Sequence, residues 1–153
     1  MFHIILYQPE IPPNTGNIIR LAANTGATLH LIHPLGFVLE DKQLQRAGLD
    51  YHDLACVQEH ETLDSCLTLF DPEHVFALSA KANTLYNTPV FQKNDAFLFG
   101  PETRGLGNDI LSTFDEAHRL RLPQLTSARS LNLANTVSIV IYEAWRQGGF
   151  RLA

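Results

Sequence analysis

The chain has 153 residues, 45% hydrophobic and 18% charged, which excludes a disordered, collagen-like or coiled-coil protein and fits one globular domain over residues 1–153. The net charge of −5 argues against binding polyanions by bulk positive potential, but residues 121–153 hold four arginines and one acid, so an RNA-binding surface would be local and arginine-based. Two cysteines without zinc or redox spacing, and an N-terminus unlike a secretory signal, indicate a cytoplasmic protein.

Apolar periodicity predicts short strands that alternate with helices. The expected strands cover residues 2–7, 28–32, 55–57, 75–79, 96–99 and 119–122. The expected helices cover 15–25, 41–47, 61–70, 108–114 and 133–147. Asn14 is expected to cap the first helix, and Gly26, Gly48 and Pro72 are expected to end the first three. This alternation predicts a mostly parallel α/β sheet with helices on both faces.

The helix expected at 133–147 is apolar nearly all round, with Val137, Val140, Ile141 and Trp145 spread over its faces. A sheet covers one side of a helix, so either a second subunit or the chain's own core must cover the rest. The longest stretch without charged residues, 21–39, is interrupted by polar residues, glycine and proline, so no membrane span is expected.

The segment NTGNIIRLAANTG places Asn17, Arg20 and Asn24 on one face of the first helix. Asparagine is a weak helix former that brings both a donor and an acceptor. This face is therefore either a functional surface or an unusual solvated one.

A second polar segment, GPETRGLG, follows the apolar strand expected at 96–99. It lies at the carboxyl end of that strand, where open α/β sheets bind ligands, and its glycines allow close backbone approach. The alternative is a connecting loop with a weak surface pair between Glu102 and Arg104. The segment lacks the Gly-Lys-Ser/Thr of a P-loop, and the Pro-rich turn after the first strand lacks a nicotinamide-binding fingerprint.

A third polar segment, RLRLPQLTSARSLNLANTVS, leads from the last strand into the last helix. Ser130 or Asn132 in it is either functional or a helix cap. The seven histidines lack metal-ligand spacing, there is no G-x-S-x-G elbow, and neither cysteine has an electropositive neighbour in sequence. A metal centre, a serine hydrolase and a cysteine nucleophile are therefore not expected.

Taken in order, NTGNIIR, FGPETRGL and LRLP…SARSLNLANTVSIVIYEAWRQ resemble the three motifs of the SPOUT superfamily of RNA methyltransferases, in its ribose 2′-O-methylating branch. The match covers nearly the whole chain, and IILYQPEIPPNTGNIIRLAANTG is most similar to the YibK/TrmL group. The resemblance implies an enzyme that uses S-adenosylmethionine to methylate the wobble nucleotide, cytidine or carboxymethylaminomethyluridine, in the anticodon stem-loop of leucine-type tRNAs. It also implies a homodimer, a C-terminal trefoil knot and no metal.

Residue by residue, the resemblance assigns six positions to the cofactor pocket: Leu78, Gly100, Glu102, Leu122, Ser130 and Leu131. Arg20 matches a catalytic arginine, and Asn132 matches an asparagine that shapes the active site. Because guanidinium stays protonated, we expect Arg20 to orient a phosphate and stabilise charge rather than act as a base. Relatives often carry Met where this chain has Leu131, a mild change in volume.

We expect Arg104, Arg121 and Arg129 to supply the phosphate contacts to RNA. Three other functions remain open: a non-catalytic RNA-binding dimer of the same fold, a methyltransferase for a different RNA position, and a small-molecule α/β enzyme with a nucleotide cofactor. The presence of Arg20 and Asn132 disfavours the first of these, and the missing glycine fingerprints disfavour the third.

Overall fold

The computed structural model describes residues 1–39 and 46–151, in which seven strands form one sheet of order β3-β2-β1-β6-β4-β7-β5. Every neighbouring pair of these strands is parallel. The strands are β1 (His3–Tyr7), β2 (Thr28–Ile32), β3 (Val57–His60), β4 (Val75–Leu78), β5 (Thr84–Leu85), β6 (Ala96–Phe99) and β7 (Arg119–Arg121).

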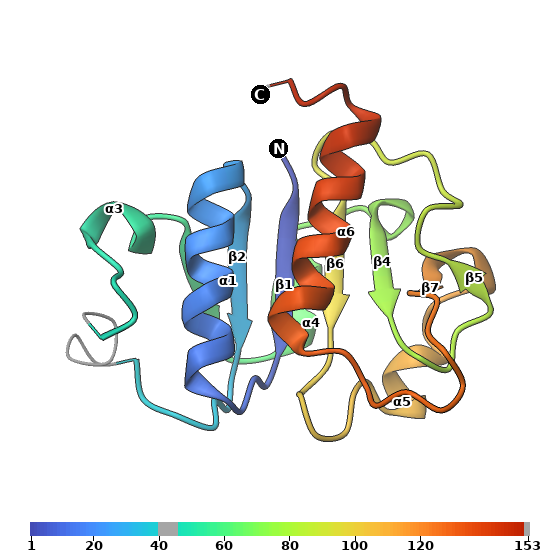
Figure 1. Ribbon diagram of the computed structural model, residues 1–153, viewed down its shortest axis with the longest axis horizontal. Coiled ribbons are helices and arrows are strands. Elements are labelled where there is room, and N and C mark those ends of the chain that lie inside the picture. The colour runs from blue at the N-terminus through green and yellow to red at the C-terminus, as the bar shows by residue number, and fades with distance from the viewer. Residues whose placement is uncertain (40–45, 152–153) are drawn as a thin grey trace.

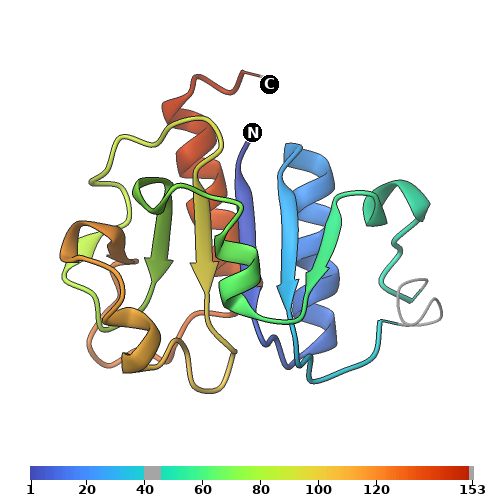
Figure 2. The same cartoon turned by 180° about the vertical axis from the view of Figure 1, so that it is seen from behind.

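Helices cover both faces of this sheet, as the alternation of elements predicted (Figures 1 and 2). The long helices α1 (Pro12–Thr25) and α6 (Leu133–Gln147) pack side by side on one face. The short helices α4 (Leu63–Leu67) and α5 (Asn108–Leu111) lie on the other face, and α3 (Tyr51–Leu54) packs beside α1. Within the described residues, no helix is long and apolar enough to cross a membrane.

The central strands β4 and β6 are buried along their whole length because both faces of the sheet are covered. Side chains that alternate along each strand therefore enter two separate cores. Phe97 and Phe99 belong to the core under α1 and α6, whereas Ala96 and Leu98 belong to the core under α4 and α5. With both faces covered, the ends of the central strands are where the sheet can be reached by a ligand.

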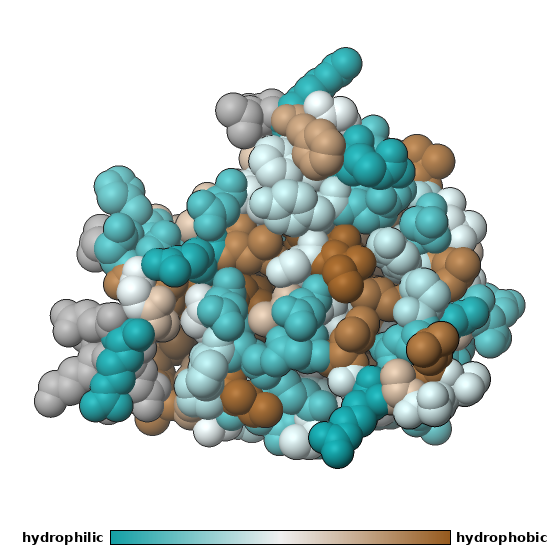
Figure 3. Space-filling view, viewed as in Figure 1, coloured by the Kyte–Doolittle hydropathy of each residue, from teal (hydrophilic) through white to brown (hydrophobic). Residues whose placement is uncertain are grey.

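The outer face of α6 stays exposed and partly apolar. Ile139 is 39% exposed and Tyr142 is 46% exposed, whereas Ile141 is only 1% exposed in the core of its own chain. Figure 3 shows hydrophobic side chains among polar ones on the face that carries α1 and α6. The chain's own core thus covers one side of α6 and leaves another uncovered.

The strands predicted at 28–32 and 96–99 and the helix predicted at 133–147 are confirmed at their bounds. The first helix ends at Gly26, as predicted, in the left-handed conformation with φ of 72°. It begins earlier than predicted, at Pro12, because a proline in the first turn lacks only an N–H that would be unpaired there. The prediction that Asn14 caps this helix is wrong, since Ile11 is the N-cap and Asn14 is buried in the first turn.

Shorter elements shift or differ from the prediction. The strand predicted at 55–57 lies at Val57–His60, and the helix predicted at 61–70 begins after the Thr62 cap and ends at Leu67. The helix predicted at 108–114 ends at Leu111. The helix predicted at 41–47 falls mostly outside the described residues, although Gly48 beyond it has the positive φ, 71°, expected of a helix-ending glycine.

Candidate functional site

The carboxyl ends of β4, β6 and β7 open onto a cavity of ≈ 440 Å³. Three loops build it, following those three strands in turn, and the start of α6 closes one side. All six residues assigned to the cofactor pocket line this cavity: Leu78, Gly100, Glu102, Leu122, Ser130 and Leu131. Segments far apart in the sequence thus meet at one place, at the strand ends where open α/β sheets bind ligands.

The cavity is large enough for a small-molecule ligand and has apolar walls. Leu78 and Leu122 are nearly buried, Leu131 is 40% exposed, and Phe99 and Leu120 lie beneath them. Apolar side chains facing one another beside the polar backbone of loops suit a heteroaromatic ring with hydrogen-bonding edges. The residues present therefore fit an adenine-containing cofactor such as S-adenosylmethionine.

Gly100 is required by the fold of its own loop. A Cβ atom at this position would lie 2.3 Å from both the Gly105 carbonyl carbon and the Leu106 nitrogen. The loop folds back on itself at this point, and the Gly105 N–H donates to the Pro101 carbonyl at 2.8 Å. The sequence predicts that the glycines let the backbone approach a ligand. At Gly100 the close neighbour is the backbone of the same loop, and this packing sets the shape of the cavity wall.

Glu102 lines the cavity, but its carboxylate is engaged by the loop after β1. It accepts hydrogen bonds from the backbone N–H groups of Glu10, at 3.0 and 3.3 Å, and of Ile11. In return, Glu10 Oε1 accepts from the backbone N–H of Thr103 at 3.1 Å and from its hydroxyl at 2.7 Å. These bonds from Thr103 lower the pKa of Glu10. Glu102 thus joins two loops instead of aiming its charge into the cavity.

The alternative interpretation of the second motif, a Glu102–Arg104 surface pair, is wrong for the described residues. The Arg104 guanidinium donates to the side-chain oxygen of Gln8. Gln8 itself has a φ of 49°, an uncommon conformation for a residue other than glycine. A turn at the end of β1 therefore holds Arg104 at the rim of the cavity, which it also lines.

Asn132 caps α6, which is one of the two roles that the sequence left open for it. Its Oδ1 caps α6 by accepting from the N–H groups of Ala134 at 2.9 Å and Asn135 at 3.3 Å. Its side-chain amide donates to Asn14 Oδ1 at 2.9 Å, which ties the start of α6 to the first turn of α1. Both asparagines line the cavity. The role of Asn14 was missed because its spacing from Asn132 in the sequence gives no sign of contact.

Arg20 lies elsewhere. Asn17, Arg20 and Asn24 share an exposed face of α1, as their spacing predicted. The start of α1 contributes Asn14 to the cavity lining, but Arg20, further along the same helix, is not a lining residue. Its Nη2 instead donates to the Gly48 carbonyl at 3.0 Å. The chain therefore does not bring its own Arg20 to its own cavity.

Of the three arginines expected to bind RNA, Arg104 and Arg129 lie in loops of this region and Arg121 is the last residue of β7. Arg104 and Arg121 line the cavity, and Arg129 is exposed on the loop that leads to α6. Sequence reasoning missed Lys81, an exposed cation that also lines the cavity, in the loop after β4. The position of Lys81 just after an apolar strand could have placed it at the strand ends where ligands bind. The cavity rim thus carries cations from two loops and from the end of β7 despite the net negative charge.

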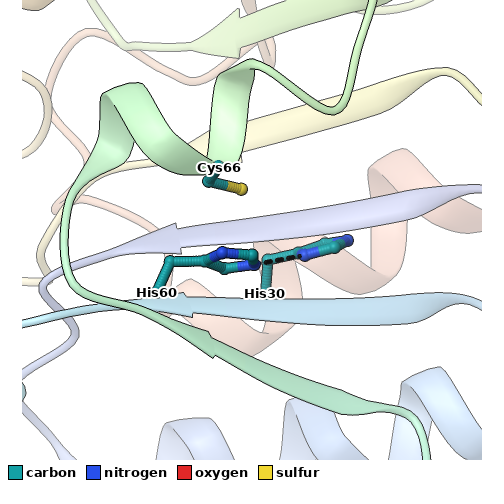
Figure 4. A group of neighbouring side chains, drawn as sticks. All are labelled: His30, His60 and Cys66. Carbon is teal, nitrogen blue, oxygen red and sulfur yellow. Dashed lines mark hydrogen bonds between the residues drawn. The ribbon is translucent and has the colours of Figure 1, made fainter.

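A group of histidines crosses the sheet on the α4 face (Figure 4). His30, which is 1% exposed, hydrogen-bonds to His3 at 3.1 Å and to His60 at 2.9 Å through its two ring nitrogens. Cys66 on α4 faces this row, and ligand atoms of His30, His60 and Cys66 lie within 4.8 Å of one another. Burial lowers the pKa of His30 to about 4 and raises the pKa of Cys66 to about 11. The imidazoles therefore satisfy one another as neutral rings beside a protonated thiol.

Comparison with known proteins gives a consistent family. The model of the SpoU rRNA Methylase family matches residues 1–142. A curated tRNA (cytidine(34)-2′-O)-methyltransferase of Methylovorus glucosotrophus is 57% identical over 98% of this chain and 97% of its own. Its counterpart from Escherichia coli K12 is 49% identical over 98% of this chain and 96% of its own.

A solved structure described as giving insights into 2-OH methylation of C/U34 on tRNA superposes with a TM-score of 0.87. It is 42% identical and covers 99% of this chain and 98% of its own. The likeness extends over the whole sheet and the loops that build the cavity, so the resemblance inferred from three motifs is confirmed. The chain belongs to the SpoU methylase family of the SPOUT-type RNA methyltransferases.

Proposed function

We propose that this protein is a tRNA 2′-O-methyltransferase that uses S-adenosylmethionine to methylate the wobble nucleotide, cytidine(34) or a modified uridine, of leucine-type tRNAs. One observation carries the proposal: the cavity at the strand ends is lined by all six residues assigned to the cofactor pocket. The substrate rests on relatives at 49–57% identity that carry this activity in their names. Residues 1–153 act as one methyltransferase domain.

The chain's residues bind and orient the reactants. When bound, S-adenosylmethionine would supply an electrophilic methyl group on a sulfonium, and S-adenosylhomocysteine would be the leaving group. The ribose 2′-hydroxyl would take the methyl group and release its proton to water. Leu78, Leu122 and Leu131 line the cavity and would flank the adenine, and loop backbone groups near Gly100 would bind its polar edge. Placing the 2′-oxygen in line with the methyl group gives much of the rate. The Arg20 guanidinium holds a phosphate of the RNA in that position.

A homodimer completes this site. Arg20 projects from the exposed face of α1, outside its own cavity, so a second copy must supply the cavity with which it works. The uncovered face of α6, with exposed Ile139 and Tyr142, offers apolar surface for that contact. The trefoil knot implied by the resemblance belongs to the same proposal, and the meeting of the loops after β4, β6 and β7 at one cavity supports it.

The anticodon stem-loop binds across the cavity rim in this proposal. Arg104, Arg121 and Arg129 contact phosphates there, and the enzyme works in the cytoplasm, where such substrates occur. A local cluster of arginines reconciles RNA binding with a net charge of −5. Guanidinium groups also suit phosphate geometry because they donate two parallel hydrogen bonds.

A second candidate is methylation at a different RNA position. The description of the matching family refers to rRNA, whereas the relatives with high identity are named for tRNA. A non-catalytic RNA-binding dimer is a third candidate, disfavoured by the intact cavity. The three candidates differ in which RNA becomes labelled.

The test is transfer of labelled methyl from S-adenosylmethionine to tRNA that lacks wobble ribose methylation, followed by nucleoside analysis. Label in 2′-O-methylcytidine or a 2′-O-methylated uridine at position 34 supports the proposal. Label in rRNA alone would favour the second candidate. Cofactor binding by calorimetry with no labelling of total RNA would favour the third.

A further inference from the structure

Arg20 is held by one backbone carbonyl. Its Nη2 donates to the Gly48 oxygen at 3.0 Å, across 28 residues of sequence. The guanidinium has five N–H donors, so this bond leaves four for another partner. Among the described residues, Arg20 forms no ion pair within 4.0 Å. The contact therefore orients the group and leaves its charge available to a ligand.

Gly48 is suited to this contact in two ways. Its φ of 71° lies in the left-handed region, which glycine adopts without the steric cost that other residues incur. A Cβ atom at this position would lie 3.0 Å from Arg20 Nη2 and 3.8 Å from its Cζ. A side chain at position 48 would thus strain the backbone that carries the carbonyl and would also crowd the guanidinium.

The residues that follow Gly48 fix its carbonyl in place. Leu49 is buried in the core under α1 and α6. Asp50 is the N-cap of α3, where it forms a capping box with Asp53: each carboxylate accepts from the other residue's backbone N–H at 3.0 Å. Both residues that follow the carbonyl are therefore anchored, one by burial and one by hydrogen bonds.

A second glycine brings this segment against α1. A Cβ atom at Gly16 would lie 3.2 Å from the Cβ of Ala47, a tighter spacing than side chains normally adopt. Gly16 stands four residues before Arg20, on the same helix. The close packing of Ala47 on α1 thus sets the distance between Arg20 and the Gly48 carbonyl.

We propose that Gly48 is a positioning residue for Arg20, one that acts through its carbonyl and its missing side chain to aim the guanidinium at the RNA substrate. This inference rests on the role of Arg20 in the proposed function. It can be tested separately from the proposed function, because the Gly48 carbonyl restricts rotation of the Arg20 guanidinium even when no RNA is bound.

The first experiment measures that restriction directly. Arginine side-chain ¹⁵N NMR of the cofactor-free protein, with the Arg20 signal assigned from an Arg20→Lys variant, reports rotation about the Cζ–Nη2 bond. We expect slow rotation for Arg20 in the native protein and faster rotation in Gly48→Ala. Equal rotation rates in the two proteins would overturn the proposal, whatever reaction the enzyme catalyses.

The second experiment measures the consequence for catalysis. Because a misplacement of about 1 Å can cost 10²-fold in rate, we expect Gly48→Ala to lower kcat for tRNA methylation by about 10- to 100-fold. The dissociation constant of S-adenosylmethionine should stay within about twofold. Gly149→Ala is the matched control, since Gly149 has the same φ of 71° but its added Cβ would meet only Arg151 Nε, at 3.9 Å.

A double-variant cycle separates positioning from general damage to the fold. If Gly48 acts through Arg20, Gly48→Ala should lower kcat no further in an Arg20→Ala background. Additive losses in the double variant, or an unchanged or raised kcat in Gly48→Ala alone, would overturn the proposal. Failure of the role proposed for Arg20 gives a different result, in which Arg20→Ala methylates tRNA as well as the native protein does. Failure of the proposed function itself leaves position 34 unlabelled even with the native protein.

Discussion

Glu10 and Glu102, 92 residues apart, each place a carboxylate on the backbone of the other's loop. Glu102 accepts from the N–H groups that begin α1, and Glu10 accepts from Thr103 in the loop after β6. Two carboxylates lie close together here because each is stabilised by hydrogen bonds from the other loop. The exchange connects the helix that carries Arg20 to the loop that walls the cavity.

Glu102→Gln should weaken this connection. Glutamine keeps the shape of the side chain. Its NH₂ group replaces one of the two oxygens that accept from the Glu10 and Ile11 N–H groups, and an NH₂ group can only donate. We expect the free energy of unfolding to fall by about 0.5–1.5 kcal/mol, the usual net contribution of one hydrogen bond, because these N–H groups are partly exposed, and cofactor affinity to fall with it. Denaturant unfolding and calorimetry measure the two effects, with exposed Glu61→Gln as the control.

Two variants of Asn132 separate its two hydrogen-bonding roles. Asn132→Ala removes the cap of α6 and the bond to Asn14, so it should cost about 1 kcal/mol for the cap alone and more in total. Asn132→Asp keeps a capping oxygen but loses the amide donor. If the Asn132→Asp variant unfolds at the same denaturant concentration as the native protein, the bond to Asn14 contributes nothing to stability.

The buried histidine row should make the protein less stable in acid. Burial holds the pKa of His30 at about 4, below its ordinary value of 6.5, so the unfolded chain takes up the proton first as pH falls. The free energy of unfolding should therefore decrease from about pH 6.5 down to about pH 4, by at most about 1.4 kcal/mol per pH unit for this group.

Thermal unfolding of His30→Gln against the native protein checks this prediction. The difference in stability between the two proteins should change through that pH interval and be constant above it. His74 acts in the opposite sense, since a hydrogen bond to Asp95 raises the pKa of His74, so the difference is more informative than the native profile alone. A parallel shift at every pH would contradict the prediction.

The dimer proposal is best tested at Ile139. Ile141, which the sequence also places on the last helix, is 1% exposed, so a charge there would disrupt the chain's own core. Ile139→Glu should instead give a folded monomer without methyltransferase activity, as measured by analytical ultracentrifugation and the methyl-transfer assay. Val90→Glu, at a site 84% exposed, is the control. An Ile139→Glu dimer with full activity would place the subunit contact elsewhere.

The arginine prediction concerns salt dependence. Neutralising Arg121 or Arg129 with Gln should weaken tRNA binding and reduce the slope of log Kd against log salt concentration by about one unit for each phosphate that no longer pairs with an arginine. The measurement is a filter-binding titration at several salt concentrations. Weaker binding with an unchanged slope would mean that the arginine does not contact a phosphate.

The sequence predicted those parts of the fold that repeat a strong local pattern. The strand Ala96–Phe99 and the helix Leu133–Gln147 have long apolar runs bounded by Gly100 and Gly148, and both are confirmed at their bounds. The two-residue strand β5 and the four-residue helix α3 were missed because packing, more than propensity, decides elements so short.

The candidate site could likewise be predicted only in part from the sequence. Motif matching identified six residues that line the cavity, because they belong to recognisable motifs at the ends of strands, but it missed Asn14 and Lys81. It could not show that the Glu102 carboxylate turns away to Ile11, or that Arg20 is held by Gly48, since both contacts join distant segments through backbone atoms. Almost every residue has a backbone carbonyl and N–H, so residue type does not show which of them will form a hydrogen bond.

The order of the strands has a consequence for synthesis on the ribosome. Strand β1 lies between β2 and β6, and Ile5 is opposite both His30 and Leu98. The nascent chain can pair β1 with β2 early, but the other edge of β1 must wait for β6, which begins 64 residues after β2 ends at Ile32. During that interval an apolar strand edge is open to pairing with other chains. Folding of this protein should therefore depend on chaperones that shield such edges until β6 arrives.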